Sequence, residues 1–419
     1  MSSRPRSEAG GGAREPAGLY LHIPFCSAVC PYCDFAVLVG GRERRQAFVE
    51  DLLTEIALYG EERRGEQRHG QKRHGEERRD KASFAGMFRA GVDSIYFGGG
   101  TPSMLEPEDL ARILAALRDA FPIVPGATLS FEANPEDVTA EGAKAWRELG
   151  VSMLSLGVQS FDEGELRFLG RRHTTDEARR CVTRAMAAGF VTVSVDLIFS
   201  LPIQTPEVLR RNLEQAIDLA PDHLSGYELE LHPRTAFGKR QARGELEALP
   251  DTQQAEHFRL IHSMLSDAGY AAYEVSNFAR GAEHRSHHNQ KYWRHVPYLG
   301  LGPSAHSFDG HKRWWNERHL AAWQRRLRAG EKPTAGQETL SQQDLALETL
   351  MLGLRTTAGV DLGRFARRFA FDLVDANRGL IERLEDDGLL SRRGDHLVPT
   401  LAGLAVADGL AAAFSLTAG

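Results

Sequence analysis

Residues 19–35 read LYLHIPFCSAVCPYCDF, which places three of the chain's four cysteines, Cys26, Cys30 and Cys33, directly after a short apolar run. The run is typical of a buried strand, so the cysteines are expected on the loop that follows it. A CxxxCxxC spacing supplies three thiolates, which suits a four-iron cluster whose fourth iron is left to a non-protein ligand. Structural zinc stays open at this point, since a fourth nearby ligand such as His22 would complete a zinc site.

The composition narrows the class of protein. The chain has 419 residues, 42% of them hydrophobic and 26% charged, which predicts a soluble globular protein of two or three domains. The net charge of −6 gives no indication of nucleic-acid binding. The sequence contains no run of about 18 apolar residues, so it predicts no transmembrane helix. Residues 1–18 contain arginines but no apolar stretch, so we expect a disordered leader, not a secretory signal, and a cytoplasmic protein.

One segment is set aside as low-complexity. Residues 63–81 read RRGEQRHGQKRHGEERRDK, a degenerate five-residue repeat with almost no apolar side chain. Such a segment buries too little to offset the entropy lost on ordering. We therefore expect an inserted mobile loop over residues 62–82, whose histidines, His69 and His74, contact solvent.

Strand-like and helical patterns alternate through the first half of the chain. Strand patterns cover residues 19–23, 94–97, 128–132, 153–158, 191–199 and 223–231, and helical patterns cover 43–59, 107–121, 140–149, 174–188 and 206–219. Near-continuous apolar strands that alternate with helices predict a parallel sheet covered by helices. Six such units fit a partial TIM-like (βα)6 barrel or an open doubly wound sheet.

Polar residues at the strand ends favour the barrel. The second strand runs into Gly98-Gly99-Gly100, and Glu132, Gln159 and Asp196 lie at the ends of later strands. In a barrel these ends face one shared mouth, whereas an open sheet spreads them along a crevice. The glycines offer unobstructed backbone N–H groups to a carboxylate, and Arg171 can pair with a carboxylate. Glu132 and Asp196 can accept hydrogen bonds from an ammonium group or from ribose hydroxyls. The pattern predicts a zwitterionic nucleoside ligand beside the cluster.

The motifs CxxxCxxC, GGGTP, FEANPE, LGVQS, LGRRH and DLIFSLP occur in this order and together resemble the radical S-adenosylmethionine superfamily, in its coproporphyrinogen-dehydrogenase-like branch. The resemblance implies that Cys26, Cys30 and Cys33 bind a [4Fe-4S] cluster, with S-adenosylmethionine on its open iron. By motif position it also implies S-adenosylmethionine contacts at Tyr20, Tyr32, Gly99, Gly100, Thr101, Glu132, Gln159, Arg171 and Asp196.

Two further features distinguish between subfamilies. Coproporphyrinogen III dehydrogenases extend the triplet to CxxxCxxCxC, but here that last position is Phe35. The CDF ending resembles HemW-type heme chaperones instead. Their HNxxYW motif, linked there to heme binding, is matched by His288, Asn289, Tyr292 and Trp293. A neutral imidazole is a good heme ligand and aromatic faces stack on a porphyrin. His288 is the expected heme ligand, and His287 is the alternative ligand. The competing interpretation is a polar loop that binds no heme.

The expected domains are a barrel over residues 19–235, a connecting region over 236–332 that carries the HNxxYW motif, and a mostly helical, winged-helix-like domain over 333–419. The mixed charge of the last domain favours packing or partner docking over DNA binding.

The resemblance implies a heme chaperone that binds heme and passes it to an apo-hemoprotein, such as a respiratory membrane enzyme. The alternative is an oxygen-independent coproporphyrinogen III dehydrogenase, and a third hypothesis is radical chemistry on an unrelated substrate. No residue is assigned a catalytic role.

Overall fold

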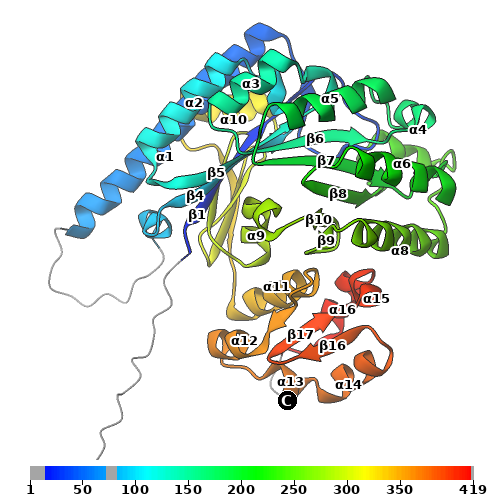
Figure 1. Ribbon diagram of the computed structural model, residues 1–419. Coiled ribbons are helices and arrows are strands. Elements are labelled where there is room, and N and C mark those ends of the chain that lie inside the picture. Colours follow the sequence, from blue (N-terminus) through cyan, green and yellow to red (C-terminus); the bar gives the residue numbers. More distant parts are fainter. Residues whose placement is uncertain (1–14, 72–82, 417–419) are drawn as a thin grey trace, which may run out of the picture.

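The computed structural model describes residues 15–71 and 83–416. It has a large body of sheet and helices and a smaller carboxyl-terminal body, each with its own hydrophobic core (Figure 1). Of the expected leader, residues 1–14 lie outside the described part, and Ala17 and Gly18 already belong to the first strand. No helix in the described part combines the length and the apolar character needed to cross a bilayer.

Twelve strands form the main sheet, in the order β14-β13-β12-β11-β1-β4-β5-β6-β7-β8-β10-β9. The six central strands are parallel: β1 (Ala17–Ile23), β4 (Val92–Gly99), β5 (Ile123–Ala133), β6 (Met153–Gln159), β7 (Thr192–Phe199) and β8 (His223–Glu228). The helices between them are α1 (Arg42–Gln71), α2 (Pro107–Ala120), α3 (Ala140–Glu148), α4 (Glu163–Phe168), α5 (Thr175–Ala187) and α6 (Pro206–Asp218).

The strand order confirms the partial barrel. The six parallel strands follow one another in chain order, whereas a doubly wound sheet reverses its order at a switch point. The helices that connect them therefore cover the outer face of one curved sheet (Figure 1). β1 and β8 do not pair with each other, since β1 pairs with β11 and β8 with β10, so the barrel stays open.

The two faces of the curved sheet differ in polarity. Leu19, Leu21 and Ile23 of β1 are fully buried in the core beneath the helices, and between them lie Tyr20 and His22. Successive side chains of a strand point to opposite faces, so the polar set lines the inside of the barrel. The outer face carries the packing and the inner face is left for a ligand.

The region from residue 236 to 332 extends the sheet at both edges. On the side of β1 it adds β11 (Tyr298–Leu301), β12 (His306–Phe308) and β13 (Lys312–Asn316), followed by β14 (Thr334–Thr339); on the side of β8 it adds β10 (Asn277–Ala279) and β9 (Ala271–Ala272). Its helices are α7 (Ala236–Ala242), α8 (Asp251–Asp267), α9 (His287–Trp293) and α10 (Leu320–Arg328). Short 3-10 turns are η1 (Ala85–Phe88), η2 (Pro102–Met104), η3 (Pro135–Asp137) and η4 (Ala282–His284).

Helix α1 is longer than expected, because it continues to Gln71. The first ten residues of the expected loop, 62–71, are therefore helical, and residues 72–82 lie outside the described part. Arg63 donates to Ala120 O at 2.8 Å, and the Glu66 carboxylate accepts from the backbone N–H of Ala85 at 2.9 Å. Glu, Arg and Gln are strong helix formers, so propensity and polar contacts extend the helix without apolar burial.

The smaller body is mostly helical, with a three-stranded sheet in the order β15-β17-β16. Its elements are α11 (Gln342–Leu354), β15 (Val360–Asp361), α12 (Leu362–Phe369), α13 (Leu373–Ala376), α14 (Arg378–Asp386), β16 (Leu390–Arg393), β17 (His396–Pro399), α15 (Leu401–Leu404) and α16 (Ala407–Ala413). This helix, wing and helix arrangement confirms the winged-helix-like prediction.

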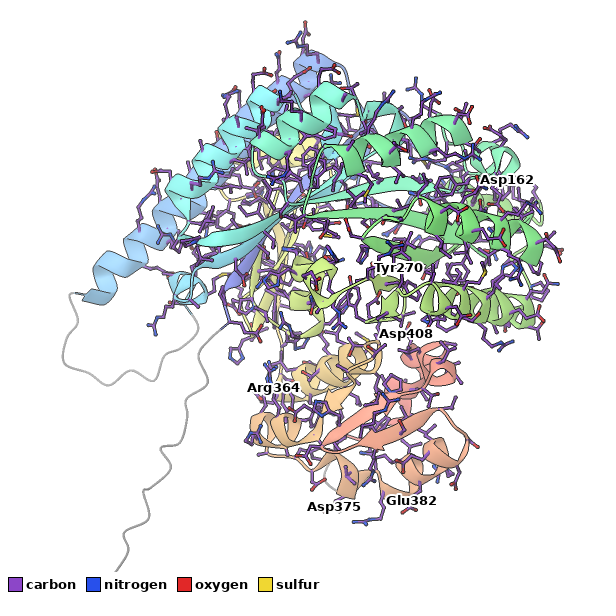
Figure 2. The ribbon with its side chains drawn as sticks, viewed as in Figure 1. Asp162, Tyr270, Arg364, Asp375, Glu382 and Asp408 are labelled. Atoms are coloured by element: carbon purple, nitrogen blue, oxygen red, sulfur yellow. The ribbon has the colours of Figure 1, made fainter. Side chains whose placement is uncertain are left out.

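Arg355 joins the two bodies. Its backbone carbonyl accepts from the N–H of Val275 at 3.1 Å, and its guanidinium pairs with Asp408 at 2.7 Å. Figure 2 shows Asp408 on the side of the smaller body that faces the barrel, with Asp375 and Glu382 on the far side. The smaller body is thus docked onto the sheet edge formed by β9 and β10.

Candidate functional site

A cavity of about 570 Å³ opens at the carboxyl ends of the parallel strands. Residues from β4 to β8 and from the cysteine loop after β1 all contribute to its lining. It contains the three expected cluster cysteines and eight of the nine expected S-adenosylmethionine contacts: Cys26, Cys30, Cys33, Tyr32, Gly99, Gly100, Thr101, Glu132, Gln159, Arg171 and Asp196. Tyr20 lies in a neighbouring cavity instead.

The cysteine loop is fastened at both ends. β2 (Phe25–Cys26) pairs with β3 (Leu38–Val39), and the backbone N–H of Cys33 donates to Cys30 O at 3.1 Å. Two side chains from other loops donate to the sulfurs: Thr101, which follows β4, donates to Cys26 Sγ, and Arg171, which follows α4, donates to Cys30 Sγ, each at 3.5 Å. Hydrogen bonds and a nearby guanidinium stabilise thiolates, so the loop is prepared to bind metal.

The thiols and their neighbours fit a cluster better than zinc. Burial raises the pKa of Cys26 to about 11, against the opposing effect of Thr101 and Arg171, and it also raises the pKa of Cys33, so a bound metal would displace the thiol protons. His22, the suggested fourth zinc ligand, is hydrogen-bonded through Nε2 to Ala36 O at 3.0 Å and through Nδ1 to the Tyr20 hydroxyl at 3.1 Å. Within the described residues, no three His, Cys, Asp or Glu converge on a single-metal site. In a four-iron cluster each thiolate binds a different iron atom, so the three sulfurs need not point at one position, as they would for zinc.

The glycine turn after β4 passes directly behind the cysteine loop. Gly99 has φ +108°, a conformation that L side chains rarely adopt. A Cβ on Gly100 would lie 2.6 Å from Phe25 O, so any other residue there would push the loop away. The backbone of the turn can therefore approach a ligand held by the loop.

Two carboxyl groups lie deeper in the barrel. Glu132 accepts from the Tyr96 hydroxyl at 2.7 Å and from the backbone N–H of Gly99 at 3.3 Å, and burial raises its pKa to about 7. Asp196 accepts from Ser155 Oγ at 3.0 Å, and burial raises its pKa as well. Each group can thus accept a hydrogen bond from a polar or cationic ligand.

Two buried polar atoms at the cavity have no hydrogen-bond partner among the described residues: Gln159 Oε1 and Arg171 Nε. The rest of the Arg171 guanidinium is fixed by Asn134 Oδ1 at 2.6 Å and Gly157 O at 2.8 Å. Buried polar groups are normally paired, so these two atoms indicate a ligand with both a donor and an acceptor. That is the chemistry of an amino acid or nucleoside.

Sequence reasoning missed Tyr96 and Ser155, which line the same cavity and hold Glu132 and Asp196. Asn134, which the sequence places with Glu132 at the end of the third strand, also lines the cavity and holds Arg171. The signal for Tyr96 was its alternation with Ile95 and Phe97, which are buried on the outer face. Period-two alternation would have assigned Tyr96 to the barrel interior.

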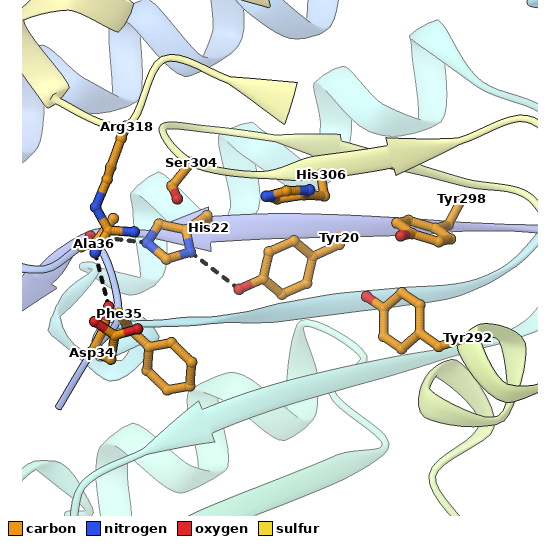
Figure 3. Close-up of a pocket in the computed structure, with 10 residues that line it drawn as sticks. All are labelled: Tyr20, His22, Asp34, Phe35, Ala36, Tyr292, Tyr298, Ser304, His306 and Arg318. Carbon is orange, nitrogen blue, oxygen red and sulfur yellow. Dashed lines mark hydrogen bonds between the residues drawn. The ribbon is translucent and has the colours of Figure 1, made fainter. Parts of the chain in front are cut away.

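Figure 3 shows a second cavity, of about 320 Å³. The two share Asp34 and Phe35, which line both. Asp34 is held by Arg234, at 2.6 Å, and its backbone carbonyl accepts from Arg318 at 2.8 Å. The second cavity is otherwise lined mainly by rings: Tyr20, His22, Tyr292, Tyr298 and His306.

His288 is a buried structural residue in this conformation. It is fully buried, with Nδ1 hydrogen-bonded to Ser94 Oγ at 3.0 Å and Nε2 to the Tyr292 hydroxyl at 2.9 Å. The expected shared face of His288 and Tyr292 is therefore present. An iron ligand needs a free ring nitrogen, so His288 could bind heme iron only after losing one of these bonds.

The HNxxYW helix, α9, lies at the amino-terminal ends of β1 and β4, opposite the cysteine loop. His287 pairs with Asp93 at 2.9 Å, and Lys291 pairs with Asp93 at 2.6 Å and donates to Pro16 O at 2.8 Å. Asn289 lies in the first turn, where its backbone N–H donates to Ser286 Oγ, and Trp293 packs edge-on against a tyrosine. Of the motif, Tyr292 alone lines the second cavity.

Comparison with known proteins agrees with this geometry. The model of the radical SAM superfamily matches residues 20–216, and that of the HemN C-terminal domain matches residues 340–406. The heme chaperone HemW of Mycobacterium tuberculosis is 36% identical over 94% of each chain. The chain belongs to the HemW family. The HemW of Bacillus subtilis is 31% identical over 88% of this chain and 92% of its own.

A solved structure supports the fold of this HemW family member. The coproporphyrinogen III oxidase HemN from Escherichia coli, a radical SAM enzyme, has a TM-score of 0.76 over 95% of this chain and 90% of its own. The sequences are 22% identical, so the likeness concerns the fold. Membership of the radical SAM superfamily implies a [4Fe-4S] cluster and S-adenosylmethionine.

Proposed function

We propose that this protein is a heme chaperone, which binds heme and transfers it to an apo-hemoprotein. The proposal is carried by the two adjoining cavities of a HemW family member: the first contains three thiols and several polar side chains, and the second is lined by aromatic rings. Aromatic faces suit a porphyrin, and a partly open site suits a ligand that must be handed on. The acceptor we propose is a hemoprotein such as a respiratory membrane enzyme, and free thiols of this kind suit the reducing cytoplasm.

The first cavity is proposed to hold the cluster and S-adenosylmethionine. Cys26, Cys30 and Cys33 would each bind one iron, and the bound cluster would supply an open iron and an electron for S-adenosylmethionine. Arg171 Nε and Gln159 Oε1 would bind polar groups of that ligand, since both atoms are buried without a partner among the described residues. In this scheme the two ligands help heme to bind or leave.

Coproporphyrinogen III dehydrogenation is the less favoured function. The position after Asp34 that is cysteine in those enzymes is Phe35 here, and its side chain is 68% exposed between the two cavities. Phe35 has no sulfur to replace that cysteine, but its exposed ring can cover a porphyrin face.

Parallel assays on anaerobically reconstituted protein test the proposal. A heme chaperone is expected to take up heme with a Soret band, to release it to an apo-hemoprotein, and to form no protoporphyrinogen IX from coproporphyrinogen III. A substantial yield of protoporphyrinogen IX would show a dehydrogenase instead, and 5′-deoxyadenosine formation that ignores porphyrin would indicate another substrate.

Binding of S-adenosylmethionine is expected to strengthen as pH rises from 6 to 8. The pKa of Glu132 is raised to about 7, so its carboxyl is mostly neutral at pH 6 and mostly anionic at pH 8. The anion attracts the ammonium and sulfonium charges of the ligand, which the neutral acid does not. Calorimetric titration of the reconstituted protein measures this dependence.

The matched variant is Glu132→Gln, which keeps the shape and the acceptor oxygen for the Tyr96 hydroxyl. The affinity of this variant for S-adenosylmethionine should stay low, and it should change less with pH than that of the wild type. A wild-type affinity that falls as pH rises would contradict the assignment of Glu132 to this ligand.

A further inference from the structure

The second cavity contains one histidine suited to bind metal, and it is not part of the HNxxYW motif. Two histidines line the cavity, His22 and His306. Both nitrogens of His22 are hydrogen-bonded, to Tyr20 and to Ala36 O. His306 is exposed, and neither of its ring nitrogens is hydrogen-bonded to another described residue.

The position of His306 suits a ligand in this cavity. In Figure 3, Tyr292 and Tyr298 lie at one end of the cavity, Asp34, Phe35 and Arg318 at the other, and His306 between them. The His306 ring stacks on Trp315, with ring centroids 5.8 Å apart and planes 26° apart. Stacking limits the rotation of the imidazole without using either nitrogen.

Other potential iron ligands in the cavity are less suitable. Phenolate oxygen can bind heme iron, but burial raises the pKa of Tyr298 to about 12 and raises those of Tyr20 and Tyr292 further. These hydroxyls stay protonated at neutral pH. Partial desolvation of the ring and the charge of Arg313 lower the pKa of His306, so its imidazole is neutral and able to bind metal.

On these observations we propose that His306 is the axial ligand of heme in the second cavity, with Phe35 and the tyrosines against the porphyrin and Arg318 near its propionates. This inference rests on the proposed heme-chaperone function. Arg318 is exposed at the cavity end and uses one N–H group on Asp34 O, which leaves others for a carboxylate. A cavity of about 320 Å³ is at the small end for ligand sites, so one edge of the porphyrin stays outside.

The proposal assigns the HNxxYW motif a supporting role. His288 holds the Tyr292 hydroxyl, and Tyr292 forms the inner wall of the cavity. The motif would then shape the porphyrin site from behind, and the iron ligand would come from β12.

Heme titration of reconstituted full-length protein tests the ligand, with His306→Ala compared with His311→Ala. His311 is an exposed histidine in the turn between β12 and β13 and does not line the cavity. His306→Ala is expected to weaken heme binding at least about tenfold and to change the Soret band, whereas His311→Ala should match the wild type. Added imidazole should restore the wild-type spectrum to His306→Ala.

The outcomes separate the inference from the function it rests on. Wild-type protein that takes up no heme would overturn the heme-chaperone function and the ligand together. If the wild type takes up heme and His306→Ala shows the same spectrum and affinity, only the assignment of His306 as the iron ligand is overturned. Arg318→Gln adds an independent readout: it should weaken heme binding but leave binding of heme dimethyl ester, which lacks free propionates, unchanged.

Discussion

Replacing Cys30 with alanine is expected to abolish the iron–sulfur cluster. Three protein thiolates are the minimum for a four-iron cluster with an open iron, so two cannot hold it stably. The variant should lose its iron, its sulfide and its cluster absorbance after anaerobic reconstitution. Because the open iron is proposed to anchor S-adenosylmethionine, affinity for that ligand should fall by more than about tenfold.

Cys181→Ala is the matched control. Cys181 is fully buried in α5, outside the first cavity, and burial raises the pKa of its thiol to about 12. Inert buried thiols do not bind metal, so this variant should assemble a full cluster. Wild-type iron content in Cys30→Ala would contradict the assignment of the cysteine loop.

Replacing His288 with alanine is expected to destabilise the fold by about 2–4 kcal/mol. The substitution removes a fully buried ring and leaves the hydroxyls of Ser94 and Tyr292 without their partner. Urea unfolding of the variant against the wild type measures the difference in free energy of unfolding. Heme binding should weaken as a consequence of the altered cavity wall.

His287→Ala separates this effect from general damage to α9. The His287 side chain is 37% exposed, and its partner Asp93 keeps an ion pair with Lys291. The decrease in the free energy of unfolding should be at most about 1 kcal/mol, as for other exposed ion pairs. If His288→Ala kept the stability of the wild type yet lost its heme spectrum, His288 would be a heme ligand after all.

The barrel and its polar mouth could be predicted from the sequence because their signals are local. The strands are near-continuous apolar runs, and the helices between them have caps such as Thr174, whose side chain completes a capping box with Glu177. The cysteine spacing and the glycine turn are likewise readable over a few residues. Parallel strands then bring their ends together, which is why Glu132, Gln159 and Asp196 line one cavity.

The position of α9 could not be predicted, because it depends on packing between distant segments. Nothing near His288 in the sequence shows that Ser94 will accept or donate a hydrogen bond to its ring. The second cavity has the same origin, since Tyr20, Tyr292 and His306 come from separate strands and a helix. The length of α1 was missed for a different reason: apolar content is a poor guide to a helix held by polar contacts.

The difference in polarity between the two faces of the curved sheet has an evolutionary consequence. Leu19, Leu21 and Ile23 contribute to stability on the outside, while Tyr20 and His22 face the ligand side. Inner side chains can therefore be exchanged without disturbing the packing between strands and helices. Side chains inside the barrel can therefore differ between proteins that share this fold, as in a HemW family member and a coproporphyrinogen III oxidase that are 22% identical.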